Sequence, residues 1–181
     1  SKPSTNPKVE PVSEAKPAET PATKDVVDTP DVNHLEKASA TASNHEANTP
    51  FTAEKAIDGK PDTRWATDQN VEKPTIEFKL EKTTVIKPVE IDWDRRVRGE
   101  QNDPNIKSWN LYYAGQDEVN GSGPGEWKLA HQRTGTPVLD EKVDLKEAVQ
   151  AKYLKLEITD YQAGTMQWKN VGIQEIRAYS N

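Results

Sequence analysis

The clearest pattern in the chain is a strict alternation of apolar and polar residues in short runs. Residues 75–80 place isoleucine, phenylalanine and leucine at every second position, and residues 89–93 and 153–159 alternate in the same way. A period of two predicts β-strands that turn one face toward a core. The full set of expected strands is 37–43, 75–80, 89–93, 109–113, 126–131, 138–145, 153–159 and 172–179.

The segments between these strands are polar and rich in turn-forming residues. The longest are residues 94–104, 115–125 and 160–171, and residues 52–57 are expected to form one helical turn. No segment has the period of a longer amphipathic helix. Many short strands joined by turns indicate an antiparallel β-sandwich, and an immunoglobulin-like sandwich and a jelly roll both agree with the periodicity.

Residues 1–34 differ in composition from the rest of the chain. They hold no aromatic residue, because the first one in the sequence is Phe51. Such a segment cannot bury enough apolar surface to offset its ordering entropy. We expect an extended linker of polyproline II character over residues 1–34, acting as a spacer, and a folded domain over residues 35–181. The prolines of this linker are Pro3, Pro7, Pro11, Pro17, Pro21 and Pro30.

The composition argues against several classes of function. The net charge of -6 disfavours nucleic-acid binding, which requires a basic surface. No apolar run approaches the roughly 20 residues of a membrane helix. The absence of cysteine excludes a disulfide framework and a thiolate metal site. His34, His45 and His131 belong to no triad or metal motif, and no two carboxylates stand out as a glycosidase pair, so we expect no catalysis.

One loop, residues 56–65 (AIDGKPDTRW), has the residue types that build a cation site. Its Asp-Gly and Pro-Asp pairs favour tight turns, which aim several oxygens at one point. Calcium takes about 6–8 oxygen ligands from carboxylates, hydroxyls and carbonyls. Trp65 provides a large apolar anchor for the loop. From these residues alone, a calcium loop and an ordinary polar turn before a strand both remain open.

Two motifs in the correct order resemble the discoidin-like (coagulation factor type C) superfamily. They are the loop just described and the last expected strand, GIQEIRAY at residues 172–179. Within the superfamily, the chain is most similar to carbohydrate-binding module family 32, from about Leu35 to Asn181. The resemblance implies an all-β, antiparallel β-sandwich jelly roll, a structural calcium ion, and sugar binding by loops at one end.

The resemblance also implies which residues hold the calcium ion. The expected side-chain ligands are Asp58, Thr63 and Glu175. The expected carbonyl ligands are those of Lys55, Lys60, Thr63 and Gln174. Glu175 is informative because it stands between apolar residues in a strand, where burying a lone carboxylate is costly.

Sugar binding requires an aromatic face for the apolar side of a pyranose and fixed polar groups for its hydroxyls. Trp168, with Gln167 and Asn170, supplies these on one long loop, although Trp168 also suits a loop anchor packed on the core. Arg96 and Arg98, with Glu100 and Asn102, supply hydrogen-bonding groups on the other loop, or form a solvated surface.

One position departs from the pattern of the resembled family. Galactose-binding members commonly carry histidine directly after the tryptophan of the first motif, and this chain has Ala66 there. Terminal galactose-type and N-acetylglucosamine-type sugars therefore both stay open as ligands, as does loss of sugar binding.

The expected function is that of a non-catalytic carbohydrate-binding module that targets a larger secreted or cell-surface, bacterial glycan-active protein to glycans. We expect a monomer with no membrane insertion. The alternative is a structural or protein-adhesion module with a degenerate sugar site. A phospholipid-binding discoidin domain is less favoured, because such a domain requires apolar loop tips and these loops are polar.

Overall fold

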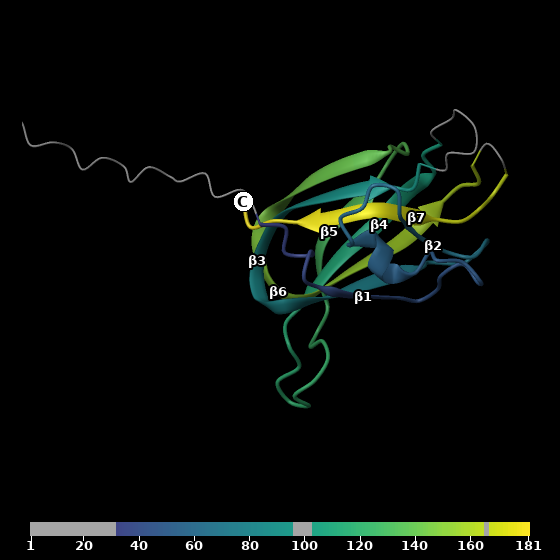
Figure 1. The fold of residues 1–181 in the computed structure, drawn as a ribbon. Coiled ribbons are helices and arrows are strands. Elements are labelled where there is room, and N and C mark those ends of the chain that lie inside the picture. Colours follow the sequence, from purple (N-terminus) through teal and green to yellow (C-terminus); the bar gives the residue numbers. More distant parts are fainter. Residues whose placement is uncertain (1–31, 96–102, 165–166) are drawn as a thin grey trace, which may run out of the picture. The chain divides into compact units, whose positions relative to one another are not determined.

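The computed structural model describes residues 32–95, 103–164 and 167–181, which form an antiparallel β-sandwich (Figure 1). Its elements are β1 (Ser39–Ala42), the 3₁₀-helix η1 (Ala53–Ala56), β2 (Trp65–Ala66), β3 (Thr75–Trp93), β4 (Ile106–Ala114), β5 (Lys128–Thr134), β6 (Asp140–Tyr161) and β7 (Gly172–Ala178). Every strand pairing among these residues is antiparallel. The expected all-β fold is therefore confirmed.

Two long strands, β3 and β6, connect the layers of the sandwich. The strand order is β2-β7-β3-β6-β4-β5, with β1 paired to β3. In the first part of β3, residues 76–79 pair with β1 and with the end of β6, whereas residues 89–92 pair with β7 and with the start of β6. Register shifts after Lys79 and Ile86 allow β3 to bend between these two sets of partners.

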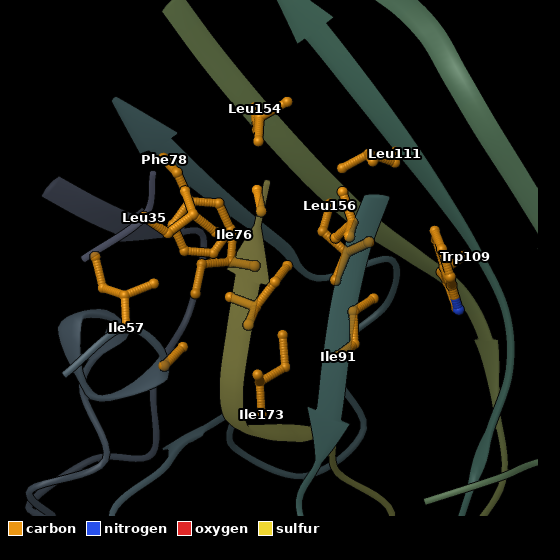
Figure 2. Close-up of a cluster of buried hydrophobic side chains, with 14 of the residues drawn as sticks. Leu35, Ile57, Ile76, Phe78, Ile91, Trp109, Leu111, Leu154, Leu156 and Ile173 are labelled. Atoms are coloured by element: carbon orange, nitrogen blue, oxygen red, sulfur yellow. The ribbon is translucent and has the colours of Figure 1, made fainter. Parts of the chain in front are cut away.

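The core lies between the layers and is built from the alternating residues seen in the sequence. Ile76, Phe78 and Leu80 are at most 1% exposed, as expected for inward-facing positions. Figure 2 shows that this cluster joins side chains of β3, β4, β6 and β7 with two from the N-terminal segments, Leu35 and Ile57. Full burial of each such aliphatic side chain contributes about 1.5–3 kcal/mol to folding.

Three tryptophans are almost completely buried: Trp65, Trp93 and Trp109. The indole N–H groups of Trp93 and Trp109 both donate to the Glu141 carboxylate, at 2.5 and 3.0 Å. Arg133 forms an ion pair with the same carboxylate at 2.8 Å. Because buried tryptophan requires a partner for its N–H, this shared carboxylate lets two indoles occupy the core without an unsatisfied donor.

The structure contains the short strand β2, which the sequence did not predict, and it joins expected strands at two places for the same reason. Expected strands 75–80 and 89–93 are one strand, β3, and expected strands 138–145 and 153–159 are one strand, β6. Residues 81–83 and 146–148 are exposed, and the pairing of β3 with β6 is interrupted there but present on both sides of the bend. The apolar alternation stops where a strand crosses between layers, although its backbone pairing resumes within a few residues.

Candidate functional site

The described parts of four loops gather at one end of the sandwich, and we call this region the loop end. They comprise residues 43–50, 67–74, 94–105 and 162–171, which connect β1 to η1, β2 to β3, β3 to β4, and β6 to β7. In Figure 1 the described parts of these loops lie at the right, opposite the end of β7. Because both ends of β3 reach this region, the bend in that strand is what brings the loops together.

Loops 43–50 and 67–74 are joined by reciprocal hydrogen bonds between Asn44 and Asp68. The Asn44 amide donates to the Asp68 carboxylate at 3.1 Å, and the Asp68 N–H donates back to the Asn44 amide oxygen at 2.8 Å. The Ala47 N–H donates to the same carboxylate at 3.0 Å. The bonds from Ala47 and Asn44 lower the pKa of Asp68, so the carboxylate remains charged and the two loops stay joined.

Loop 67–74 is also bonded to loop 162–171. Asn170 is only 8% exposed, and its amide donates to the Thr67 carbonyl at 3.1 Å. The Thr67 hydroxyl accepts from the Val171 N–H at 3.1 Å, and the Asn70 N–H donates to the Lys169 carbonyl at 2.7 Å. The side chain of Asn170 is thus built into the frame of the loop end, and its contact with sugar stays a prediction.

Loop 94–105 is fixed at both of its ends. Asp94 is buried; its N–H donates to the Gly172 carbonyl at 2.9 Å, and its carboxylate lies 3.3 Å from Arg64. At the other end, buried Asn105 donates to the carbonyls of Gln162 and Asn170, at 3.1 and 2.7 Å. The ends of loop 94–105 are therefore bonded directly to the ends of loop 162–171.

The predicted sugar residues divide between described and undescribed parts of the chain. Arg96 and Arg98, with Glu100 and Asn102, lie outside the described residues. Trp168 is half-buried and stands in a tight turn, in which the Gly164 N–H donates to the Trp168 carbonyl at 3.0 Å. The preceding Gln167 has a φ of 61°, and its N–H donates to the Gly164 carbonyl at 2.8 Å. This turn holds the indole in loop 162–171.

Sequence reasoning missed the polar residues that frame the loop end. Thr67, Asp94 and Asn105 are buried and satisfied by hydrogen bonds or ion pairs, but the sequence places them in polar segments that are expected to face water. The sequence shows Arg64 only as part of a motif. In the structure its guanidinium lies 3.9 Å above the Phe51 ring and also beside the Asp94 carboxylate. No local signal marks such residues, because their partners are distant in sequence.

The expected cation loop lies against β7 and brings two carboxylates together. The Glu175 carboxylate accepts from the Gly59 N–H at 3.2 Å. The Asp58 carboxylate accepts from the Thr63 hydroxyl at 2.6 Å and from the Lys60 N–H at 3.0 Å. Gly59 has a φ of 72°, in the region that favours glycine, so the Asp-Gly pair forms the tight turn expected from the sequence.

The remaining predicted calcium residues lie at the edges of this loop. Lys55 is in η1, directly before the loop, and Gln174 neighbours Glu175 in β7. The Gln174 amide donates to the Pro61 carbonyl at 3.4 Å, which attaches the loop to the strand a second time. The Thr63 hydroxyl also donates to the Lys60 carbonyl at 3.2 Å, so two predicted ligand oxygens are adjacent.

Glu175 has the electrostatic character expected of a carboxylate that a cation would stabilise. It is 7% exposed, and burial raises its pKa to about 7. The Gly59 N–H opposes this rise, whereas the nearby Asp58 carboxylate adds to it. The residues therefore fit a calcium ion, because a dication neutralises two carboxylates that otherwise repel each other. The described residues contain no group of three His, Cys, Asp or Glu side chains placed to hold a metal, so carbonyl oxygens would have to complete the site.

Within the parts of the chain that the structure describes, no helix has the length and apolar character needed to cross a bilayer.

Comparison with known protein families gives one match. The model of the F5/8 type C domain matches residues 39–172, which include the loop end, the cation loop and six of the seven strands in full. No curated protein matches this chain by sequence.

Solved structures of carbohydrate-binding modules share the fold. Chitosan-binding module 1 of a chitosanase/glucanase from Paenibacillus sp. IK-5 matches with a TM-score of 0.66 and 21% identity, covering 82% of this chain and 98% of that one. The family 32 module of Streptococcus pneumoniae EndoD matches with a TM-score of 0.66 and 20% identity, covering 83% and 100%. The family 32 module of Clostridium perfringens NanJ, solved with galactose, matches with a TM-score of 0.63 and 18% identity, covering 82% and 98%.

Proposed function

This chain belongs to the F5/8 type C domain family, and from that premise we propose that residues 35–181 form a non-catalytic carbohydrate-binding module. The observation that carries the proposal is the loop end. Four loops from distant parts of the sequence are bonded to one another there, through their described residues, and one of them carries the half-buried Trp168. Such a frame supports the proposal because it holds an aromatic face in a fixed position, which lowers the entropy lost on binding a sugar.

We assign sugar contact to Trp168 and to the arginines of loop 94–105. Stacking on an indole hides the C–H face of a pyranose from water, while Arg96 and Arg98 donate hydrogen bonds to its hydroxyls. Asn170 contributes by holding the loop, and we keep it as a proposed contact of the sugar. A shallow and hydrated site of this kind binds with modest affinity.

The similar solved structures support sugars of the galactose and glucosamine classes as ligands. One neighbour was solved with galactose, and a second chitosan-binding module was solved with chitotriose. Since Ala66 carries no imidazole, we favour recognition through stacking and arginine contacts over recognition through a histidine.

The larger setting follows from the neighbours and from the sequence of residues 1–34. We propose that the module belongs to a secreted or cell-surface bacterial glycan-active protein, and that the linker separates it from a neighbouring module. Tethering to a glycan surface raises the local concentration of the parent protein there, which is an effective-concentration effect. We further propose a structural calcium ion between loop 58–63 and β7.

A second candidate is a protein-adhesion or structural module whose sugar site is degenerate. The observation that favours it is Ala66, which is buried and leaves the loop end without a histidine at that position. Under this alternative the same rigid loops would contact a protein.

A glycan array probed with the fragment, in calcium and in chelator, tests the proposal. We expect binding to glycans that share one terminal sugar. Trp168→Ala should reduce that binding about five- to thirtyfold, since stacking contributes roughly 1–2 kcal/mol, and should leave the thermal midpoint within a few degrees. Arg96→Ala and Arg98→Ala should then separate the arginine that contacts sugar from the one that faces water.

Val119→Ala is the matched control, because Val119 is 93% exposed and lies in loop 115–125, outside the loop end. A fragment that binds no glycan on a broad array would refute the proposal and favour the adhesion module. A Trp168→Ala variant that unfolds would show that Trp168 anchors the core, so that the sugar contact would have to be reassigned.

A further inference from the structure

A polar hollow lies at the loop end, between loop 67–74 and the last residues of β6. Its volume is about 450 Å³, within the range of roughly 300–1,000 Å³ that small-molecule sites occupy. It is lined by residues 70–73 of loop 67–74, by residues 159–161 at the end of β6, and by Lys169, the residue that follows Trp168. The residues that matter here are Glu72, Lys73, Thr159, Asp160, Tyr161 and Lys169, and we call this the Asp160 hollow.

The walls of the Asp160 hollow are fixed by hydrogen bonds. The Tyr161 hydroxyl donates to the Val71 carbonyl at 2.6 Å, and the Asn70 N–H donates to the Lys169 carbonyl at 2.7 Å. Asn70 and Lys73 have φ values of 59° and 44°, in the left-handed region, and Lys73 directly precedes proline, which restricts its backbone further. Two strained residues in one short loop persist only where the surrounding contacts hold them.

The charged groups of the hollow are not used within the described structure. Glu72, Lys73, Asp160 and Lys169 are all exposed, and among the described residues none of them forms an ion pair or a side-chain hydrogen bond. Among these four side chains as the structure describes them, that of Lys169 has one further contact, because its ammonium group lies 5.5 Å from the centre of the Tyr161 ring. Two carboxylates and two ammonium groups thus line one hollow without neutralising one another.

This balance of charges selects the chemistry of the ligand. A phosphate or sulfate group would be repelled by the two carboxylates, and a cation by the two ammonium groups. A neutral sugar ring carries several hydroxyls, each of which both donates and accepts hydrogen bonds. Carboxylates only accept and ammonium groups only donate, so the hollow can satisfy both roles of the ligand hydroxyls.

We propose that the Asp160 hollow is a second sugar subsite, which takes a neutral ring next to the one stacked on Trp168. The proposal rests on the proposed glycan-binding function and adds that the module recognises at least two consecutive sugars. Its position supports this, because Lys169 directly follows Trp168 and its carbonyl accepts the bond from Asn70. Glu72 and Asp160 accept hydrogen bonds from adjacent hydroxyls, and Lys73 and Lys169 donate to ring substituents.

Calorimetric titration with a panel of neutral monosaccharides, and with the di- and trisaccharides that end in the same sugars, tests the proposal. The wild type should bind the best disaccharide about tenfold more tightly than its terminal monosaccharide. The double variant Glu72→Gln/Asp160→Asn should lose most of that gain and keep the monosaccharide affinity within about twofold, because a neutral amide oxygen accepts a weaker hydrogen bond than a charged carboxylate does. Both side chains are exposed, so the thermal midpoint should not change.

Glu118→Gln is the matched control, since Glu118 is an exposed carboxylate in loop 115–125, and it should keep the disaccharide gain. Equal affinity of the wild type for mono- and disaccharide, or an unaffected double variant, would overturn the subsite and leave the proposed function intact. Tighter binding of sulfated than of neutral disaccharides would overturn the assignment to a neutral ring. No binding to any sugar of the panel would refute the proposed function itself.

Discussion

Gly172 directly follows loop 162–171, and its carbonyl accepts a hydrogen bond from Asp94 at the start of loop 94–105. A Cβ atom at this position would lie 2.7 Å from the Trp65 carbonyl oxygen and 2.8 Å from the Asp94 Cβ. Neither neighbour has room to move, because Trp65 is fully buried and Asp94 is paired with Arg64. We expect Gly172→Ala to lower the free energy of unfolding by about 1–3 kcal/mol, measured by urea denaturation.

Gly115→Ala provides the comparison for this prediction. No atom lies within 4 Å of a Cβ built on Gly115, so this substitution should leave the stability nearly unchanged. Equal stability of the two variants would show that the backbone at residue 172 shifts at little cost to accommodate a methyl group. Loops 94–105 and 162–171 would then be held less rigidly than their hydrogen bonds suggest.

Buried polar residues also mark the limit of what the sequence predicts about the site. The buried carboxylate of Glu175 was predictable because it interrupts an apolar strand. Asp94 and Asn105 were not, because they flank a loop of charged residues and resemble it in composition. Their burial depends on partners such as Arg64 and Asn170, which come near only when β3 bends and β7 closes the sandwich.

The loop of residues 58–63 and strand β7 form the element pair whose contact we expect to depend on calcium. At a calcium concentration of 100 times its Kd, binding to the folded state alone should raise the thermal midpoint by about 5–10 °C. A chelator should remove this gain, as followed by thermal unfolding. Glu175→Gln should abolish the response to calcium, because it replaces a charged ligand near Asp58 with a neutral amide.

In chelator the same variant should be at least as stable as the wild type. The reason is that a neutral side chain removes the cost of burying the Glu175 charge and its repulsion by Asp58. An exposed control, Glu118→Gln, should respond to calcium as the wild type does. A wild type whose midpoint does not change between calcium and chelator would rule out the structural ion.

Strand prediction succeeded wherever one face of a strand is buried and failed where a strand passes between layers. Ile76, Phe78, Leu154 and Leu156 alternate as expected because they all face one core. Residues 81–83 and 146–148 carry no such signal, since both of their faces meet solvent. The number of strands was therefore overestimated although every predicted inward residue of β3 was correct.

The described core of the folded molecule begins at Leu35. All described buried side chains lie between Leu35 and Ala178, and residues 1–31 contain no aromatic side chain to add to them. We expect proteolytic removal of residues 1–31 to leave the thermal midpoint within about 1–2 °C, well under the change that a loss of 1 kcal/mol produces. A fall of more than about 5 °C on trimming would show that this segment stabilises the domain.

The entry and exit of the folded domain lie side by side, and this arrangement decides where mechanical tension acts. The His34 N–H donates to the Ala178 carbonyl at 2.8 Å, and the His34 ring is hydrogen-bonded to Ser180 at 2.7 Å. This contact is at the opposite end of β7 from the loop end (Figure 1). A force that pulls the chain at residues 33 and 180 is therefore carried first by these few bonds. The loops that we propose to hold sugar are at the other end of the domain, so this force does not pass through them. A domain tethered under flow would therefore keep its sugar bound while the bonds between His34 and the C-terminal residues are stretched.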